Sequence, residues 1–229
     1  MRSMIDIAWR LCYNRFKKRG GMMPRFQGII ENEKYTIGCT GQTVWVWDKN
    51  DTVLTKFKDL IYADRAAISP CGDIFVVKSV AGRLAVYSLE TLSLRQKIRF
   101  SRVNVSQDDG FCFSPDGKYF LNVERQEDDL HSAISIYNTS DFSLVSRTLL
   151  GEDLMISHIQ EVEGEYYVLG FDFVAKYKNN EICDIRRVTS AEQEFYWEHL
   201  NQTMFGMMLD DGQEIKAVHT LRDLWEYRK

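Results

Sequence analysis

The chain has 229 residues, of which 45% are hydrophobic, 13% aromatic and 27% charged, with only 3 prolines and 14 glycines. This apolar fraction can fill a sizeable core, so the composition excludes a disordered chain, a collagen and a small disulfide scaffold. The 29 basic and 33 acidic residues give a net charge of −4, which creates no overall attraction to nucleic acid or anionic lipid. The charge is uneven, because residues 1–25 carry +6 and the other 204 residues carry −10.

Residues 1–21 are predicted to form a basic amphipathic helix that ends at a glycine pair. Its apolar face consists of Ile5, Ala8, Trp9, Cys12 and Phe16. This face can pack against the acidic remainder of the chain and leave the basic residues in solvent. Trp9, Tyr13 and Phe16 lie beside basic residues, so two alternatives stay open: docking on a partner protein, or contact of residues 1–19 with a membrane surface. Nucleic acid is not an expected partner, because the acidic body opposes it.

An internal repeat organises residues 25–188. Four strand-like runs end in or near an aromatic residue, at spacings of 40, 50 and 40 residues, and these aromatics are Trp47, Tyr87, Tyr137 and Tyr177. A turn motif keeps a compatible phase: the segment 69–73 reads Ser-Pro-Cys-Gly-Asp, and 114–118 reads Ser-Pro-Asp-Gly-Lys. Proline presets φ at the first corner of such a turn and glycine supplies the positive φ, so both segments are predicted to be tight reversals between strands.

Each repeat unit is interpreted as a four-stranded sheet of about 40 residues, which covers its faces only when neighbouring sheets stack radially. The predicted fold class is therefore all-β, a small β-propeller over residues 25–229. The expected blades span about 25–60, 62–101, 105–150, 153–188 and 190–229. In the alternative there are four blades and a C-terminal cap, in which Thr220–Tyr227 form a short helix with Thr220 as its N-cap.

The run Thr43–Asp48, which ends in Trp-Asp, and the following Ser-Pro-x-Gly segment together resemble a WD40-type propeller repeat over about residues 35–150. The resemblance implies a propeller fold and a role in binding other proteins. The sequence departs from the family pattern in two ways. No Gly-His pair precedes the blades, and the aspartate usual before the third strand is replaced by Gly41, Ala81 and His131.

Two acidic clusters lie in segments predicted to be exposed loops of the third unit. They supply the candidate partner-binding residues Asp108, Asp109, Asp128 and Asp129, to which the N-terminal segment adds Trp9, Tyr13 and Phe16. A paired-carboxylate acid/base site is the less favoured interpretation, because nothing indicates that the clusters converge in an apolar pocket. His158 lies in the opening strand of the fourth unit, where residues lining a propeller axis originate, and is interpreted as a structural histidine.

No catalytic, cofactor-binding or metal-binding residue is predicted. The four histidines have no His or Cys partner at ligand spacing, and no nucleotide, hydrolase or zinc-protease motif is present. The five cysteines are scattered, and those at 39, 71 and 112 are expected to pack like small apolar groups in a reducing compartment. No apolar run approaches the roughly 20 residues that span a bilayer, and no secretory signal is evident, so a cytoplasmic location is expected.

The favoured hypothesis is a non-catalytic protein-protein interaction module that binds a partner through propeller loops and the N-terminal helix, so the protein is not expected to be an enzyme. One alternative is a propeller hydrolase or lactonase with a metal at the axis, which needs inward-facing Asp, Glu or His from several blades. Another is an adaptor recruited to a membrane surface by residues 1–19.

Overall fold

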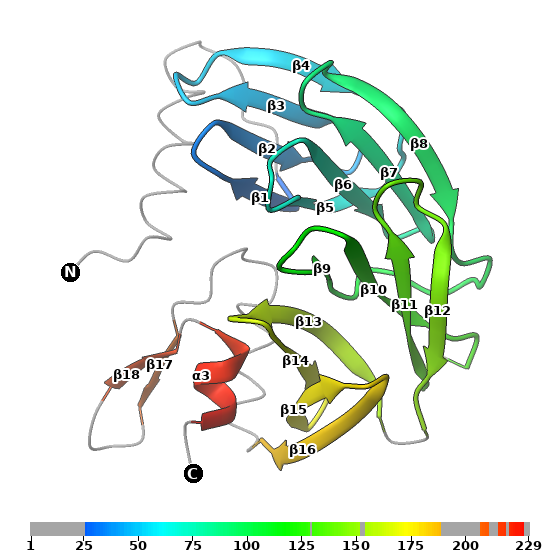
Figure 1. The fold of residues 1–229 in the computed structure, drawn as a ribbon, viewed down its shortest axis with the longest axis vertical. Helices are drawn as coiled ribbons and strands as arrows, with labels where there is room; N and C mark the ends of the chain where they lie inside the picture. The colour runs from blue at the N-terminus through cyan, green and yellow to red at the C-terminus, as the bar shows by residue number, and fades with distance from the viewer. Residues whose placement is uncertain are drawn as a thin grey trace.

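A computed structural model describes residues 26–128, 130–151, 154–188, 207–210, 215–218 and 220–226. Four four-stranded antiparallel sheets follow one another along the chain and are arranged in an arc, as Figure 1 shows. The helix predicted over residues 1–21 lies outside the described residues. The all-β class and the propeller-like stacking of four-stranded sheets are confirmed.

The first two sheets cover residues 28–57 and 63–99. Sheet A contains β1 (Gly28–Glu31), β2 (Tyr35–Cys39), β3 (Val44–Asp48) and β4 (Val53–Phe57). Sheet B contains β5 (Ala63–Ile68), β6 (Ile74–Ser79), β7 (Arg83–Ser88) and β8 (Ser93–Arg99).

The next two sheets cover residues 111–149 and 156–187. Sheet C contains β9 (Phe111–Phe113), β10 (Tyr119–Arg125), β11 (Ser132–Asn138) and β12 (Leu144–Leu149). Sheet D contains β13 (Ile156–Val162), β14 (Glu165–Gly170), β15 (Phe173–Lys178) and β16 (Glu181–Arg187). In every sheet the strands pair in sequence order.

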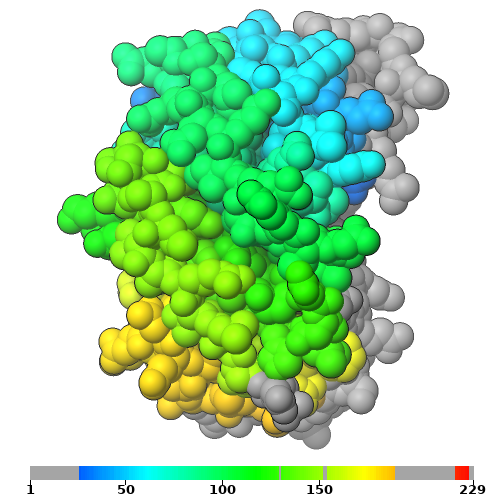
Figure 2. Space-filling model, turned by 90° about the vertical axis from the view of Figure 1, so that its right-hand side faces the viewer, coloured from blue at the N-terminus to red at the C-terminus, as the bar shows by residue number. Residues whose placement is uncertain are grey.

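The first strand of each sheet lies on the inside of the arc and the fourth lies on its outer rim (Figure 1). Neighbouring sheets meet through these inner strands, since β1 contacts β5, β5 contacts β9, and β9 contacts β13. Figure 2 views the rim, where the sheets follow one another from cyan through green to yellow.

Hydrophobic residues of facing sheets form the core between them. Ile37, Val46, Phe75 and Tyr87 belong to one cluster between sheets A and B, and similar clusters lie between B and C and between C and D. The four recurrent aromatics occupy the third strands β3, β7, β11 and β15 and are all buried. The central strands of sheets B and C are apolar on both faces because each of these sheets lies between two others.

Both predicted tight turns are present. Gly72 and Gly117 have φ near +70° and donate backbone hydrogen bonds to the carbonyls of Ser69 and Ser114, at 2.8 and 2.9 Å. The cysteine of the first turn, Cys71, is exposed and its thiol lies 2.8 Å from a carboxylate oxygen of Asp73. The expectation that it packs like an apolar group is therefore wrong, because the turn points this position into solvent. Cys39 is buried as expected.

After Val188 the described residues form a two-stranded antiparallel sheet, β17 (Met207–Asp210) and β18 (Ile215–Val218), and the short helix α3 (Leu221–Glu226). Thr220 Oγ1 accepts a bond from the backbone N–H of Asp223 at 3.1 Å, and the Asp223 carboxylate accepts one from the N–H of Thr220 at 2.9 Å. Thr220 is thus the N-cap that the four-blade alternative predicts, with a reciprocal capping box. Leu221, Leu224 and Trp225 of this helix pack on sheet D. The number of blades stays a prediction.

Candidate functional site

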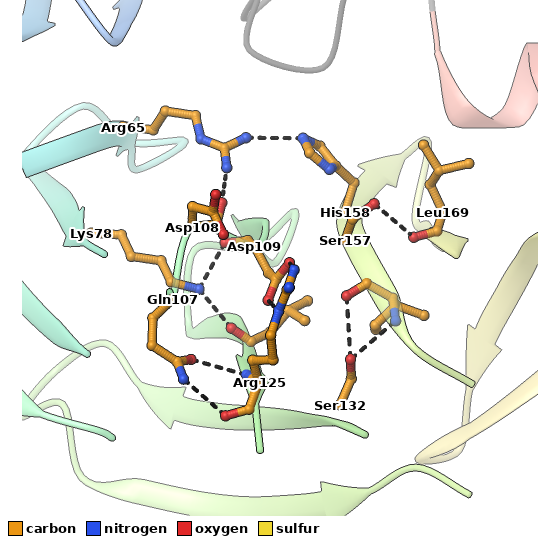
Figure 3. A network of polar contacts seen from close by, with 12 residues as sticks. Arg65, Lys78, Gln107, Asp108, Asp109, Arg125, Ser132, Ser157, His158 and Leu169 are labelled. Atoms are coloured by element: carbon orange, nitrogen blue, oxygen red, sulfur yellow. Dashed lines mark hydrogen bonds and ion pairs between the residues drawn. The ribbon is translucent and has the colours of Figure 1, made fainter. Parts of the chain in front are cut away.

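The inner strands of sheets B and D are joined by Arg65. This side chain extends from β5, and its Nη1 donates to Nε2 of His158 on β13 at 2.9 Å (Figure 3). Its Nη2 donates to the backbone carbonyl of Asp108, and its Nε donates to the Asp64 carboxylate at 2.8 Å. A guanidinium can only donate, so Nε2 of His158 is the acceptor here. His158 therefore makes a structural contact, in agreement with its interpretation as a structural histidine.

Glycine at position 28 makes room for this arrangement. A Cβ at Gly28 would lie 2.7 Å from Cγ of Arg65 and 3.0 Å from the carbonyl oxygen of Asp64. Only a residue without a side chain lets Arg65 pass so close to the backbone of β1. The first residue of the first sheet thus permits the contact between the second and fourth sheets.

A lysine is buried where sheets B and C meet. Lys78, on β6, is 1% exposed, and its Nζ donates to the carbonyls of Asp109 and Val123 at 2.7 and 2.6 Å (Figure 3). The rings of Phe100 and Phe111 lie 5.2 and 6.0 Å from Nζ. Burial lowers the pKa of Lys78 to about 7, against the opposing effect of the Asp109 carboxylate. The sequence analysis did not single out this residue.

Residues 107–110, which we call the lead-in segment, run between sheets B and D before β9 begins. The side-chain amide of Gln107 donates to the carbonyl of Arg125 and accepts its N–H, at 2.8 and 2.9 Å. Gly110 donates to the carbonyl of Ser157 at 2.7 Å, and a Cβ there would lie 2.9 Å from the backbone of His158. The lead-in segment is therefore held by hydrogen bonds to sheet C at Gln107 and to sheet D at Gly110.

Asp109 corrects the prediction of an exposed acidic loop. It is 2% exposed, and Arg125 donates to its two carboxylate oxygens from Nε and Nη2, at 3.1 and 2.8 Å. Burial raises the pKa of Asp109, and the bonds from Arg125 offset part of the rise. Side chains of an extended segment alternate in direction, so Asp109 points inward while its neighbour Asp108 is exposed.

The other candidate partner-binding residues are either exposed or outside the described residues. Asp128 is exposed and accepts backbone N–H groups of Leu130 and His131 at 3.0 and 3.1 Å, which orders the loop between β10 and β11. Asp128 thus lies in an exposed loop, whereas Asp108 is an exposed side chain on the otherwise buried lead-in segment. Asp129, Trp9, Tyr13 and Phe16 lie outside the described residues. The binding role of all seven candidates stays a prediction.

One end of the sheets carries a chain of backbone hydrogen bonds between consecutive connections. We call this end the linked face. Its bonds join the pairs Gly41–Ala63, Tyr62–Val80, Val80–Gln107, Ser132–Leu150 and Met155–Phe171. The opposite end consists of short turns such as those at Gly72 and Gly117. The longer connections 100–110 and 126–131 belong to the linked face.

Large apolar side chains are exposed on the linked face. More than half of the surface of Ile61, Tyr62, Leu130 and Phe171 is exposed, and these residues belong to three separate connections. Tyr62 has φ of 55°, in the left-handed region that a bulky side chain rarely adopts. The bond from the N–H of Val80 to its carbonyl, 3.2 Å long, holds the backbone there.

Within the described ranges, no three His, Cys, Asp or Glu side chains lie close enough together to hold a metal ion. In the same ranges, no helix has the length and apolar character needed to cross a bilayer.

No protein-family model and no curated protein sequence matches the chain. Solved structures do match it. A hydrazine synthase of Kuenenia stuttgartiensis has a TM-score of 0.63 at 13% identity, covering 74% of this chain and 52% of its own. U3-55K has a TM-score of 0.61 at 10% identity, covering 73% and 53%. The RRP9 WD40 repeats have a TM-score of 0.60 at 11% identity, covering 71% and 51%. The chain spans about half the length of each, and at these identities the likeness concerns the fold.

Four-stranded sheets that stack through their inner strands define the class of protein as a β-propeller. The Trp-Asp end of β3, the two Ser-Pro-x-Gly turns and the likeness to the RRP9 WD40 repeats make the particular type plain. The chain has the fold of a WD40-like β-propeller.

Proposed function

We propose that this propeller is a non-catalytic protein-protein interaction module that binds its partner through the linked face. Tyr62 is the observation that carries the proposal, because it is 61% exposed and is held at a positive φ. A strained backbone and an exposed aromatic ring both cost folding free energy, and such features persist where they serve a site. Tyrosine is also among the residues that most often dominate binding energy.

The surroundings of Tyr62 support a protein partner. Ile61 is exposed beside it, and Leu130 and Phe171 add apolar area at other connections of the linked face. The exposed carboxylates of Asp108 and Asp128 supply polar contacts around these groups. An apolar centre with a polar rim is typical of protein interfaces. Residues 1–21, with Trp9, Tyr13 and Phe16, are proposed as a second contact with the partner.

The test uses Tyr62→Gly, with Tyr119→Ala as its matched control. Glycine adopts φ of 55° without strain, so Tyr62→Gly should keep or raise the melting temperature. Tyr119 is exposed at the opposite end of sheet C and has an ordinary backbone. A partner captured from lysate and then purified should bind Tyr62→Gly at least about tenfold more weakly than wild type in titration calorimetry, a typical hot-spot loss.

Tyr119→Ala should bind that partner as wild type does. Equal binding of Tyr62→Gly and wild type would rule out the linked face as the site, and an equal loss in both variants would place the site elsewhere on the propeller.

A further inference from the structure

The outer part of sheet B carries a concentration of positive charge on an acidic body. Residues 83–102 contain one acid, Glu90, and five basic residues, which are Arg83, Arg95, Lys97, Arg99 and Arg102. Residues 26–229 together carry −10. Arg83 is half-buried and the other four are exposed. The charge is therefore local, and β8 lies on the rim that faces the viewer in Figure 2.

The basic residues are arranged so that they repel one another. Arg83 on β7 lies directly opposite Arg99 on β8, and Lys97 lies two residues along the same face. Like charges directly opposite each other destabilise a sheet. None of the five forms an ion pair with any residue that the structure describes. Other surface arginines do, since Arg147 bonds Glu124 at 2.9 Å and Arg222 bonds Glu226 at 3.0 Å.

The strand that carries these charges has an open edge. β8 is the last strand of sheet B and pairs only with β7, so one side of its backbone has no partner strand among the described residues. Charged side chains protect such edges from unwanted pairing. The equivalent edge strands β4 and β12 have a single basic residue each, Lys56 and Arg147. The edge strand β16 has two arginines, but they are balanced by two acids on the same strand, Glu181 and Asp184. Edge protection therefore does not account for three basic residues on β8.

We propose that an extended acidic segment of a partner protein adds to β8 as a fifth strand of sheet B. Alternate residues of a strand are about 6.6 Å apart, so carboxylates at every second position of the added strand match Lys97 and Arg99. The open backbone edge of β8 supplies hydrogen bonds, and the paired charges fix the register. A long nucleic acid fits less well, because it would also run over the acidic remainder of the molecule.

Lys97 and Arg99, the residues that the test changes, lie on β8 itself, and only Arg102 of the basic group lies in a connection of the linked face. β8 extends along the rim, whereas Tyr62 lies in the connection between β4 and β5. Substitutions at Tyr62 and at Lys97 and Arg99 therefore test the two binding proposals independently.

The experiment measures binding of a fluorescent nine-residue peptide in which glutamate alternates with valine and threonine. The test variant is Lys97→Glu with Arg99→Glu in the full-length chain. The control is Lys34→Glu with Lys49→Glu, which makes the same change of charge in exposed turns of sheet A. Fluorescence anisotropy should show at least about tenfold weaker binding to the test variant and a change below twofold for the control. Replacing the central valine of the peptide with proline should also weaken binding, because an added strand needs that backbone N–H.

The test variant should fold at least as well as wild type, since Arg99→Glu converts the repulsion with Arg83 into attraction. Equal affinity of test variant and wild type would overturn the proposal. Tighter binding of single-stranded oligouridylate than of the peptide, or a dimer of this chain that Lys97→Glu with Arg99→Glu dissolves, would also overturn it by identifying a different occupant.

Discussion

Lys78 lies on a central strand, yet its ammonium group is held between two sheets and away from solvent. Its two carbonyl acceptors belong to residues 31 and 45 positions further along the chain. It therefore fastens the lead-in segment and β10 to sheet B. No motif in the sequence gave this lysine a role. Because these acceptors lie so far along the chain, they leave no local pattern in the sequence. The only signal is the position of a lysine within a strand that is buried on both faces.

The free energy of unfolding is predicted to rise with pH between about 7 and 9. Burial lowers the pKa of Lys78 from 10.5 to about 7, so in this range the unfolded chain binds a proton that the folded chain does not. Stability then increases with pH, by at most about 1.4 kcal/mol per pH unit. Urea unfolding at several pH values checks this. Lys78→Met should remove the slope, and equal slopes in wild type and variant would contradict the assignment.

At the scale of elements, the lead-in segment shows how an irregular stretch becomes a structural part. It enters between two sheets because Gln107 bonds the backbone of Arg125 and Gly110 approaches the backbone of His158. The sequence placed Asp108 and Asp109 together in an exposed loop. The alternation of an extended chain separates them, and Arg125, which binds Asp109, lies 16 residues away.

Charge reversal at these two neighbours is predicted to have opposite consequences for folding. Asp109→Lys leaves the guanidinium of Arg125 buried beside a second cation, which should lower the free energy of unfolding by about 3–5 kcal/mol. Asp108→Lys changes an exposed side chain and should stay within about 0.5 kcal/mol of wild type. Chemical denaturation measures the free energy of unfolding of both variants. Similar decreases in the two would show that Asp109 is not the buried partner of Arg125.

At the scale of the whole molecule, the repeat was sufficient to predict four of the sheets. Trp47, Tyr87, Tyr137 and Tyr177 recur because each third strand contributes a buried aromatic side chain to the core, and every unit shares this requirement. The chemistry between the sheets was largely missed, because Arg65, Gln107 and Arg125 act on partners in other units. In the C-terminal part, α3 covers a face of sheet D. The N-cap residue Thr220 predicted this helix from the sequence, whereas the reciprocal bond from Asp223 was not predicted.

Covering sheet D is predicted to depend on Leu224, which is fully buried. Leu224→Ala should lower the free energy of unfolding by about 2–5 kcal/mol, since it leaves a cavity against Tyr167 and Leu169. Hydrogen exchange should speed up in β14 and β15 before it does in β2. The control is Glu226→Ala, which removes only an exposed ion pair with Arg222. Uniform acceleration in all sheets would mean that the helix stabilises the molecule as one unit.

The bond between Arg65 and His158 also bears on the synthesis of the protein. The two residues are 93 positions apart. At a synthesis rate of about 5–20 residues per second, His158 is made roughly 5–20 s after Arg65. During that interval Asp64, the adjacent residue, is the acceptor already available to the guanidinium. Arg65 of the second sheet therefore has no histidine partner until the fourth sheet is translated. The contact between the inner strands of these two sheets can form only late in synthesis.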